Sequence, residues 1–285
     1  MVHFGSRAVT RSCLASLVED PSSVERRVVV VDNESNLKNG DLPAGHSLLS
    51  PGVNLGFGSG ANAGISALGG EPCSTFVVLN NDVNVLSGFL DAAARALNDS
   101  GVGAVAGPLW LHRPDGPLWY AGGAVNFLTG TVRQTRSHAE AERVRDVGFL
   151  PGAAIALRRS AFEELGGFSP GFFLYNEDVD LCLRLRRRGW RLRFEPGMRA
   201  IHHLGASTGS SLLSPLYLEH ITKTRLRPFR PLAYRLYLAV MHSGYVLARS
   251  AGLSVRKGRA AVPAVRALLR GHAAALATIG QGPQR

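Results

Sequence analysis

Two apolar runs, each closed by polar residues, place the strongest constraint on how this chain can fold. Residues 26–32 (RRVVVVD) and 75–79 (TFVVL) are followed directly by Asn33 and by the segment NND at 80–82. A continuous apolar run of this kind is typical of a parallel strand that helices cover on both faces. Ligands of open α/β sheets bind outside the carboxyl ends of the strands. The pattern predicts an α/β fold with a mostly parallel central sheet and places Asp32 near a ligand; capping a turn is the alternative role for this carboxylate.

The second run ends in candidate ligands of a cation. Asp82 is the single carboxylate of the NND segment, and Asn80 stands two positions before it. A hard divalent cation such as Mg²⁺ or Mn²⁺ prefers oxygen ligands and can link such a side chain to a pyrophosphate. An Asx-turn that caps the strand is the structural alternative.

A glycine-rich segment lies between the two runs. Residues 54–64 read NLGFGSGANAG and continue into an expected helix through Leu68. Glycines let a ligand approach the backbone closely, and the N–H groups at a helix start can bind phosphate. The segment matches neither a Walker loop nor GxGxxG. Its candidate binding positions are Asn54, Gly56 and Gly58, and a plain glycine turn is the alternative.

Residues 172–189 (FFLYNEDVDLCLRLRRRG) predict a helix with Asn176 as its cap and Gly189 just past its end. At about 100° per residue, Asp178 lies on the apolar stripe with Leu181, Cys182 and Leu185. The residues expected to point away from this stripe are Glu177, Asp180, Arg184, Arg187 and Arg188. A carboxylate directed inward is costly unless it is paired, binds a metal or is used in chemistry. Asp178 is therefore a candidate catalytic residue, with a buried cap or ion pair as the alternative, and we expect the helix dipole to lower its pKa.

Three blocks in this half of the chain resemble a known family. The segment YNEDVDLCLRLRRRGW is preceded by GAAIALRRSAFEELGGF and followed by EPGMRAIHHLGAS. Together they are similar to family 2 glycosyltransferases, above all to the rhamnosyltransferase-like subgroup, and the similarity extends from about Val2 to Ser207. It implies a GT-A fold and an inverting, metal-dependent transfer of a sugar from a nucleoside-diphosphate donor to a hydroxyl acceptor. Relatives usually have several apolar residues before the position of Phe4, so either the natural start lies upstream of Met1 or the nucleotide pocket is thinner and compromised.

The resemblance also implies roles for individual residues. Asp178 is the expected catalytic base, and Glu177 orients the acceptor or supports that base. Asp82 and His202 are the expected ligands of Mg²⁺ or Mn²⁺, although an isolated His is more often a core or surface residue. The expected nucleotide-sugar-binding residues are Asp32, Asn54, Gly56, Gly58, Asn80, Asn81 and Gly152. The donor expected first is dTDP-L-rhamnose, with UDP-sugars next, and the acceptor is a saccharide or a polyprenyl-linked saccharide.

The positive charge of the chain is concentrated in its last third. Residues 1–195 hold 19 Lys and Arg against 20 Asp and Glu, whereas residues 196–285 hold 13 against one. We expect a glycosyltransferase domain at 1–213 and a basic region at 214–285 with helices at 215–227, 231–251 and 263–279, each with Pro near its first turn. Basic amphipathic helices can lie on an anionic membrane surface, and packing on the domain with a solvated basic rim is the alternative.

Several other classes are disfavoured. The tail lacks the interleaved aromatic and basic residues of a nucleic-acid binder, and no zinc-ligand spacing is present. The chain lacks the glycine-rich signature of a nucleotidyltransferase near its N-terminus. A scaffold protein that binds nucleotide sugar without turnover stays an alternative. The three cysteines show no disulfide framework, no signal peptide is visible and no 18-residue apolar run exists. We therefore expect a cytoplasmic enzyme, with peripheral contact to the inner face of the plasma membrane.

Overall fold

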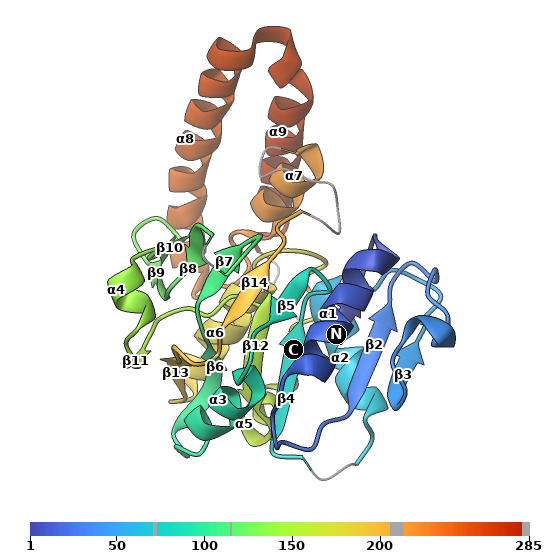
Figure 1. Ribbon diagram of the computed structural model, residues 1–285. Helices are drawn as coiled ribbons and strands as arrows, with labels where there is room; N and C mark the ends of the chain where they lie inside the picture. Colours follow the sequence, from blue (N-terminus) through green and yellow to red (C-terminus); the bar gives the residue numbers. More distant parts are fainter. Residues whose placement is uncertain (71–72, 115, 206–213, 281–285) are drawn as a thin grey trace.

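The computed structural model describes residues 1–70, 73–114, 116–205 and 214–280 (Figure 1). Two groups of strands build the main sheet. The first has the parallel order β1-β2-β3, and the second has the order β11-β13-β6-β12-β4. A parallel bridge between Val2 and Asn80 joins them. The strands are β1 (Val2–His3), β2 (Val28–Asp32), β3 (His46–Leu49), β4 (Thr75–Leu79), β6 (Val102–Ala106), β11 (Arg145–Asp146), β12 (Ala154–Arg158) and β13 (Arg191–Phe194).

The strands confirm the α/β fold, in which β12 inside the second group and β11 at its edge are the antiparallel strands. β6 and β13 are parallel, whereas β12 runs antiparallel to both β4 and β6. Both apolar runs that were read from the sequence are strands, and both end where the polar residues begin. The polar residues after β2 and β4 therefore lie at one edge of the sheet, as expected for parallel strands.

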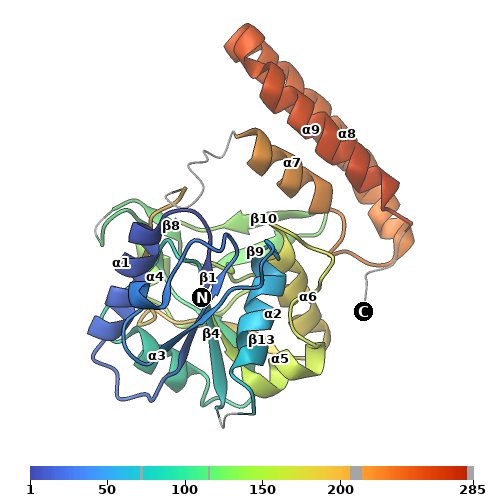
Figure 2. The ribbon, with the colours of Figure 1, turned by 90° about the vertical axis from the view of Figure 1, so that its right-hand side faces the viewer.

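Helices cover both faces of this sheet. Figure 2 shows α1 (Arg7–Glu19) and α3 (Phe89–Ala96) on one side of the strands, and α2, α5 and α6 on the other. The bounds of these last three helices are Phe57–Ala67, Arg159–Leu165 and Glu177–Arg187. This double covering explains why the strands are apolar on both faces.

A second sheet carries the remaining strands of the globular part. Its order is β5-β14-β7-β8, formed by Val83–Val85, Ala200–His202, Leu109–Leu111 and Leu118–Tyr120. A separate hairpin of β9 (Gly123–Asn126) and β10 (Thr131–Gln134) is followed by the short helix α4 (His138–Ala141). Two 3₁₀ turns lie at Asn39–Asp41 and Gly258–Ala261.

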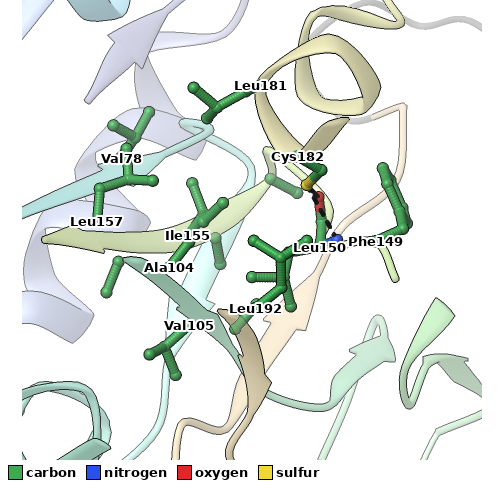
Figure 3. Packing of buried hydrophobic residues seen from close by; sticks show 14 of the residues in the cluster. Val78, Ala104, Val105, Phe149, Leu150, Ile155, Leu157, Leu181, Cys182 and Leu192 are labelled. Atoms are coloured by element: carbon green, nitrogen blue, oxygen red, sulfur yellow. Dashed lines mark hydrogen bonds between the residues drawn. The ribbon is translucent and has the colours of Figure 1, made fainter. Parts of the chain in front are cut away.

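The apolar stripe of α6 anchors that helix on the sheet. Leu181, Cys182 and Leu185 are fully buried, as the sequence predicted. The Leu150 N–H donates to the Cys182 sulfur over 3.3 Å, and Figure 3 shows these side chains packed beside strands β12 and β6. The other face of α6 differs from the expectation, because Glu177 and Asp180 are also buried.

The buried charge at Asp180 is compensated locally. Arg184 donates to the Asp180 carboxylate over 2.7 Å and to the carbonyls of Leu165 and Gly167 over 3.1 and 2.8 Å. Asn176 does not cap the helix with its side chain, because its amide donates instead to Thr224 Oγ1 (2.8 Å) and to the Ile221 carbonyl (3.1 Å). The start of α6 is therefore tied to the C-terminal region.

The C-terminal region forms the three expected helices, with ends shifted by a few residues. They are α7 (Pro215–Thr224), α8 (Leu232–Lys257) and α9 (Val262–Ala277). Helices α8 and α9 form a long hairpin that projects from the globular part, with α7 beside α9 (Figure 1). A small core of Leu218, Val246, Ala267 and Leu268 holds them together.

Candidate active site

A cavity of about 730 Å³ lies at the carboxyl edge of the main sheet. Its walls include the loops after β1, β2, β3 and β4, the end of β14, the segments before β12 and α6, the β9–β10 hairpin, and helices α7 and α8. Nine of the expected site residues line it, and they are Asn54, Gly56, Asn80, Asn81, Asp82, Gly152, Glu177, Asp178 and His202. Residues that are up to 148 positions apart in the sequence, counted from Asn54 to His202, therefore meet in one space.

Asp82 and His202 form one side of the cavity. His202 is the last residue of β14, and its Nε2 atom lies 3.3 Å from Asp82 Oδ1. Both side chains are buried, and Asp82 Oδ1 and His202 Nδ1 have no hydrogen-bond partner in the described part of the chain. The Trp119 ring lies edge-on to the His202 ring, with 4.9 Å between the ring centres. This packing holds the imidazole in place.

Asp178 also lines the cavity, beside the residues that precede β12. The Gly152 N–H donates to Asp178 Oδ2 over 3.1 Å, and the Val179 N–H donates to Oδ1 over 2.8 Å. A Cβ atom on Gly152 would lie 3.0 Å from the Phe57 ring and 3.4 Å from the Asp178 Cβ atom. The backbone at Gly152 therefore packs tightly on Phe57, and a side chain at this position would have to displace that ring.

Neighbouring side chains hold the glycine-rich loop in position. The Asn33 amide donates to the Gly56 carbonyl over 3.1 Å, and the Asn33 oxygen accepts from the Leu55 N–H over 3.2 Å. Gly56 has a φ of +77°, and a Cβ atom there would lie 2.1 Å from the Phe173 carbonyl oxygen. The loop therefore packs directly on the segment that leads into α6.

Comparison with known proteins identifies the family of this chain. The family model described as "Glycosyl transferase family group 2" matches residues 75–227. N-acetylglucosaminyl-diphospho-decaprenol L-rhamnosyltransferase of Mycobacterium tuberculosis is 32% identical over 221 residues, which cover 70% of this chain and 68% of that protein. This chain belongs to glycosyltransferase family group 2.

Solved structures show the same fold for this glycosyltransferase. The Pyrobaculum calidifontis mannosyltransferase PcManGT in complex with GDP-Man and Mn²⁺ superposes with a TM-score of 0.55 at 16% identity, over 96% of this chain and 85% of that chain. Residues 1–349 of S. aureus TarS in complex with UDP-GlcNAc superpose with a TM-score of 0.58 at 15% identity, over 94% and 78%. The GT-A-like α/β architecture that the sequence predicted is thereby confirmed.

Two of the expected nucleotide-binding residues of the glycosyltransferase do not line the cavity. The fully buried Asp32 carboxylate accepts from the Glu34 N–H over 3.0 Å and from the Leu37 N–H over 2.7 Å, so it stabilises the turn after β2. Its neighbour Asn33 lines the cavity instead. Gly58 faces inward, where a Cβ atom would lie 3.1 Å from the Phe168 side chain and 3.6 Å from that of Glu177. It permits close packing of α2 below the site.

Asn81 has a structural contact as well as its place in the cavity wall. Its amide donates to the Phe4 carbonyl over 3.0 Å and to Thr10 Oγ1 over 2.9 Å. These bonds fix the loop after β4 to the first strand and to α1. The position of the neighbouring Asp82 therefore depends on the N-terminal residues of the glycosyltransferase.

The electrostatics at the start of α6 correct the expectation for Asp178. Burial raises the pKa of Asp178 and outweighs the hydrogen bonds from Gly152 and Val179, so the net shift is opposite to the one expected from the helix dipole. Burial, followed by the charge of Asp178, raises the pKa of Glu177 to about 8. With a pKa of about 8, Glu177 is mostly protonated near neutral pH, because burial and the neighbouring Asp178 both disfavour its ionisation.

The raised pKa of Glu177 makes a prediction for stability. A carboxyl group whose pKa is higher in the folded than in the unfolded chain stabilises the fold below its ordinary value of 4.5, and this stabilisation is lost as the pH rises through about 8. We expect the free energy of unfolding to fall by more than about 1 kcal/mol over this range. Denaturant unfolding measured between pH 5 and 9 checks this, and Glu177→Gln, which mimics the protonated form, should flatten the curve. An identical slope in this variant would contradict the assignment.

Sequence reasoning missed the part of the cavity that the C-terminal helices supply. Tyr217, Arg225, Tyr245 and Arg249 line it, together with apolar residues of α7 and α9. No local motif marks them, because they are ordinary residues of basic helices. The unusual density of Arg and Tyr after residue 214 is the signal that could have directed attention to this region.

Proposed function

We propose that this glycosyltransferase moves a sugar, L-rhamnose from dTDP-L-rhamnose in the first instance, from a nucleotide donor to a hydroxyl group of a lipid-linked saccharide with inversion of configuration. The observation that carries the proposal is the single cavity in which Asp82 and His202 face the same space as Asp178. The pair Asp82 and His202 suits the diphosphate of the donor, and the carboxylate of Asp178 suits the attacking alcohol. The L-rhamnosyltransferase activity and the diphospho-decaprenol acceptor named for the mycobacterial relative support the choice of substrates.

The residues at the start of α6 would activate the acceptor. Asp178 would accept the proton of the attacking hydroxyl, and its raised pKa makes it a stronger base than an exposed aspartate. The two backbone N–H groups fix the direction of its carboxylate. The buried Glu177 Oε2 has no partner among the described residues, so a protonated Glu177 can donate to a sugar oxygen and orient the acceptor.

The residues after β4 and β14 fit a divalent cation. Two ligand atoms at right angles on Mg²⁺ or Mn²⁺ are about 3.0 Å apart, close to the 3.3 Å between Asp82 Oδ1 and His202 Nε2. Both residues also carry unpaired buried polar atoms. No cluster of three or more His, Cys, Asp or Glu that could hold a metal occurs in the described ranges, so donor phosphate oxygens would complete the shell. Such a cation stabilises the negative charge of a departing diphosphate.

The loop at Asn54 and Gly56 would hold the nucleoside diphosphate. It is rigid for the reason given above, since Asn33 clamps it and Phe173 packs against it. Gly56 immediately precedes α2, whose N-terminal N–H groups favour an anion. The complexes of related folds with GDP-Man and UDP-GlcNAc support a nucleotide sugar as the donor class.

A panel of nucleotide sugars tests the proposal. The full chain is incubated with Mn²⁺, a short-chain lipid diphosphate that bears N-acetylglucosamine, and dTDP-L-rhamnose, UDP-, GDP- or dTDP-linked donors in turn. We expect one donor to give a disaccharide product by mass spectrometry, with release of the nucleoside diphosphate. Donor binding without product for every donor would favour a scaffold that binds nucleotide sugar and would overturn the proposal.

The helical hairpin has the features of a membrane-binding surface. No helix within residues 1–70, 73–114, 116–205 and 214–280 has the length and apolarity needed to cross a bilayer. The hairpin nevertheless exposes a line of apolar side chains on α8, with Leu236, Val240 and Leu247 at 50%, 73% and 65% exposure. Exposed basic residues accompany them: Arg256, Lys257, Arg259, Arg266 and Arg270. An apolar line with a basic border matches an anionic lipid surface, so we propose peripheral contact on the cytoplasmic side.

Substitution on this line provides a prediction for membrane binding. Val240→Glu with Leu247→Glu removes two apolar groups, each worth about 1.5–3 kcal/mol when buried, so we expect vesicle binding to fall at least about tenfold. Flotation with vesicles that contain phosphatidylglycerol measures it. Val53→Glu, at a similarly exposed site on the globular part, is the matched control. Equal binding by all three proteins, or no binding by the wild type, would contradict membrane contact through α8.

A further inference from the structure

Two arginines of the C-terminal helices point to a second anion site in the cavity. Arg225 directly follows α7, and Arg249 lies in α8; both line the cavity on the side formed by the tail. They share one aromatic ring, because the guanidinium carbons of Arg225 and Arg249 lie 5.1 and 5.8 Å from the centre of the Tyr245 ring. Arg249 also donates to the Tyr245 hydroxyl over 2.8 Å.

This pair of cations has no counter-ion within the described part of the chain. Neither arginine forms an ion pair there, and Glu219, the one carboxylate after residue 195, pairs with Arg270 over 2.8 Å. Arg249 Nε is buried without a hydrogen-bond partner, and burial lowers the pKa of Arg225. Two half-buried cations on one ring repel each other and lose solvation, so an anion that binds between them would remove an unfavourable interaction.

The pair is attached to the start of α6, where the proposed base lies. Thr224, next to Arg225, accepts a hydrogen bond from the Asn176 amide and donates to the Tyr175 carbonyl over 2.9 Å. The rings of Tyr175 and Tyr217 touch, with 4.9 Å between their centres. Asn176 immediately precedes Glu177 and Asp178, so this network fixes Arg225 relative to the proposed base. Asp82 and His202, which would serve the donor diphosphate, belong to different loops.

We propose that Arg225 and Arg249 bind the diphosphate of a lipid-linked acceptor and so present its sugar hydroxyl to Asp178. This proposal rests on the function proposed above. Arginine forks match phosphate oxygens in geometry as well as charge, and two of them match the two phosphates of a diphosphate. Arg249 lies on the same helix as the exposed apolar residues Leu236, Val240 and Leu247, so a lipid chain attached to the diphosphate would continue along α8. The saccharide, the diphosphate and the lipid would then contact Asp178, the arginines and α8 in that order.

Two acceptors that differ in the diphosphate test whether the arginines bind that group. One acceptor carries the saccharide on a short-chain lipid diphosphate, and the other carries the same saccharide on a neutral alkyl chain of equal length, both in vesicle-free buffer. For Arg225→Gln and Arg249→Gln we expect kcat/KM with the diphosphate acceptor to fall about 10- to 100-fold each, the range of a charged hydrogen bond. The neutral acceptor and the KM of the donor should be unchanged. Arg249→Lys should retain part of the preference, and Lys223→Gln, in α7 but outside the cavity, should behave as wild type.

The outcomes are distinguishable. Equal losses with both acceptors, or a raised KM of the donor, would overturn the proposal, because the arginines would then serve the fold or the donor diphosphate. Calorimetric titration of the lipid diphosphate into protein saturated with nucleoside diphosphate and Mn²⁺ gives a readout without turnover. Wild type should bind, and Arg225→Gln with Arg249→Gln should not; unchanged binding in this double variant would also overturn the proposal. Failure of the wild type to transfer sugar to either acceptor, with lipid diphosphate binding intact, would refute the proposed function and leave the anion site.

Discussion

Asp178→Asn is expected to lower sugar transfer by about two to four orders of magnitude while nucleotide-sugar binding persists, the range found when a general base is removed. Asparagine keeps the shape of the side chain, but its single oxygen can accept only one of the two hydrogen bonds that Gly152 and Val179 donate to Asp178 Oδ2 and Oδ1. It cannot take a proton from the acceptor. Initial-rate kinetics give the loss of kcat, and titration calorimetry with the donor gives the affinity that should stay within a few fold of wild type.

Asp180→Asn is the matched control for this variant. Asp180 lies one half-turn further along α6, is buried, and pairs with Arg184 over 2.7 Å rather than facing the cavity. Its substitution should lower the melting temperature and leave kcat per folded molecule close to wild type. Turnover like that of the wild type in Asp178→Asn would remove this residue as the base. Loss of donor affinity in parallel with rate would instead indicate a collapsed site.

Asp82→Asn is expected to have the second largest effect, through the metal. Asp82 is the single carboxylate of the segment after β4, and its Oδ1 atom has no hydrogen-bond partner in the described chain. Removing this charge leaves His202 and neutral oxygens for a hard cation, so we expect at least about a 100-fold loss of activity at a Mn²⁺ concentration that saturates the wild type. Activity as a function of Mn²⁺ concentration, with nucleoside diphosphate binding followed in parallel, measures the shift.

Chelation gives the corresponding test on the unmodified protein. Excess EDTA should abolish transfer by the wild type, and added Mn²⁺ or Mg²⁺ should restore it. Asp91→Asn in α3, which does not line the cavity, is the control for nonspecific loss of charge. Full activity in excess EDTA would show that the phosphates are neutralised by side chains alone, and the pair Asp82 and His202 would then need another role.

The sequence predicted the frame of the molecule and most of the named residues that line the cavity, because both depend on local patterns. Apolar runs closed by polar residues gave β2 and β4, and the 3.6-residue period gave the buried stripe Leu181, Cys182 and Leu185 of α6. Strand ends and helix starts gave Asp82 and Asp178 for the same reason. Whether the two share a cavity is a matter of topology, and the resemblance to a family supplied that expectation.

Tertiary packing decided the rest, since burial and charge compensation depend on residues far away in the sequence. The sequence could not show that the neighbours of α6 bury Asp178 and Glu177 deeply enough to raise their pKa values, which reverses the shift expected from the helix dipole alone. The sequence predicted that Asp32 binds the nucleotide sugar. In the structure two nearby backbone N–H groups donate to its carboxylate, and Asn33 lines the cavity instead. The sequence predicted that the basic tail forms a separate region. In the structure Arg225 and Arg249 line the cavity, because the hydrogen bonds of Asn176 to Thr224 and Ile221 connect α7 to the start of α6. Local pattern thus determined which residues could do chemistry, and the three-dimensional environment decided their charge, their partners and their access to the cavity.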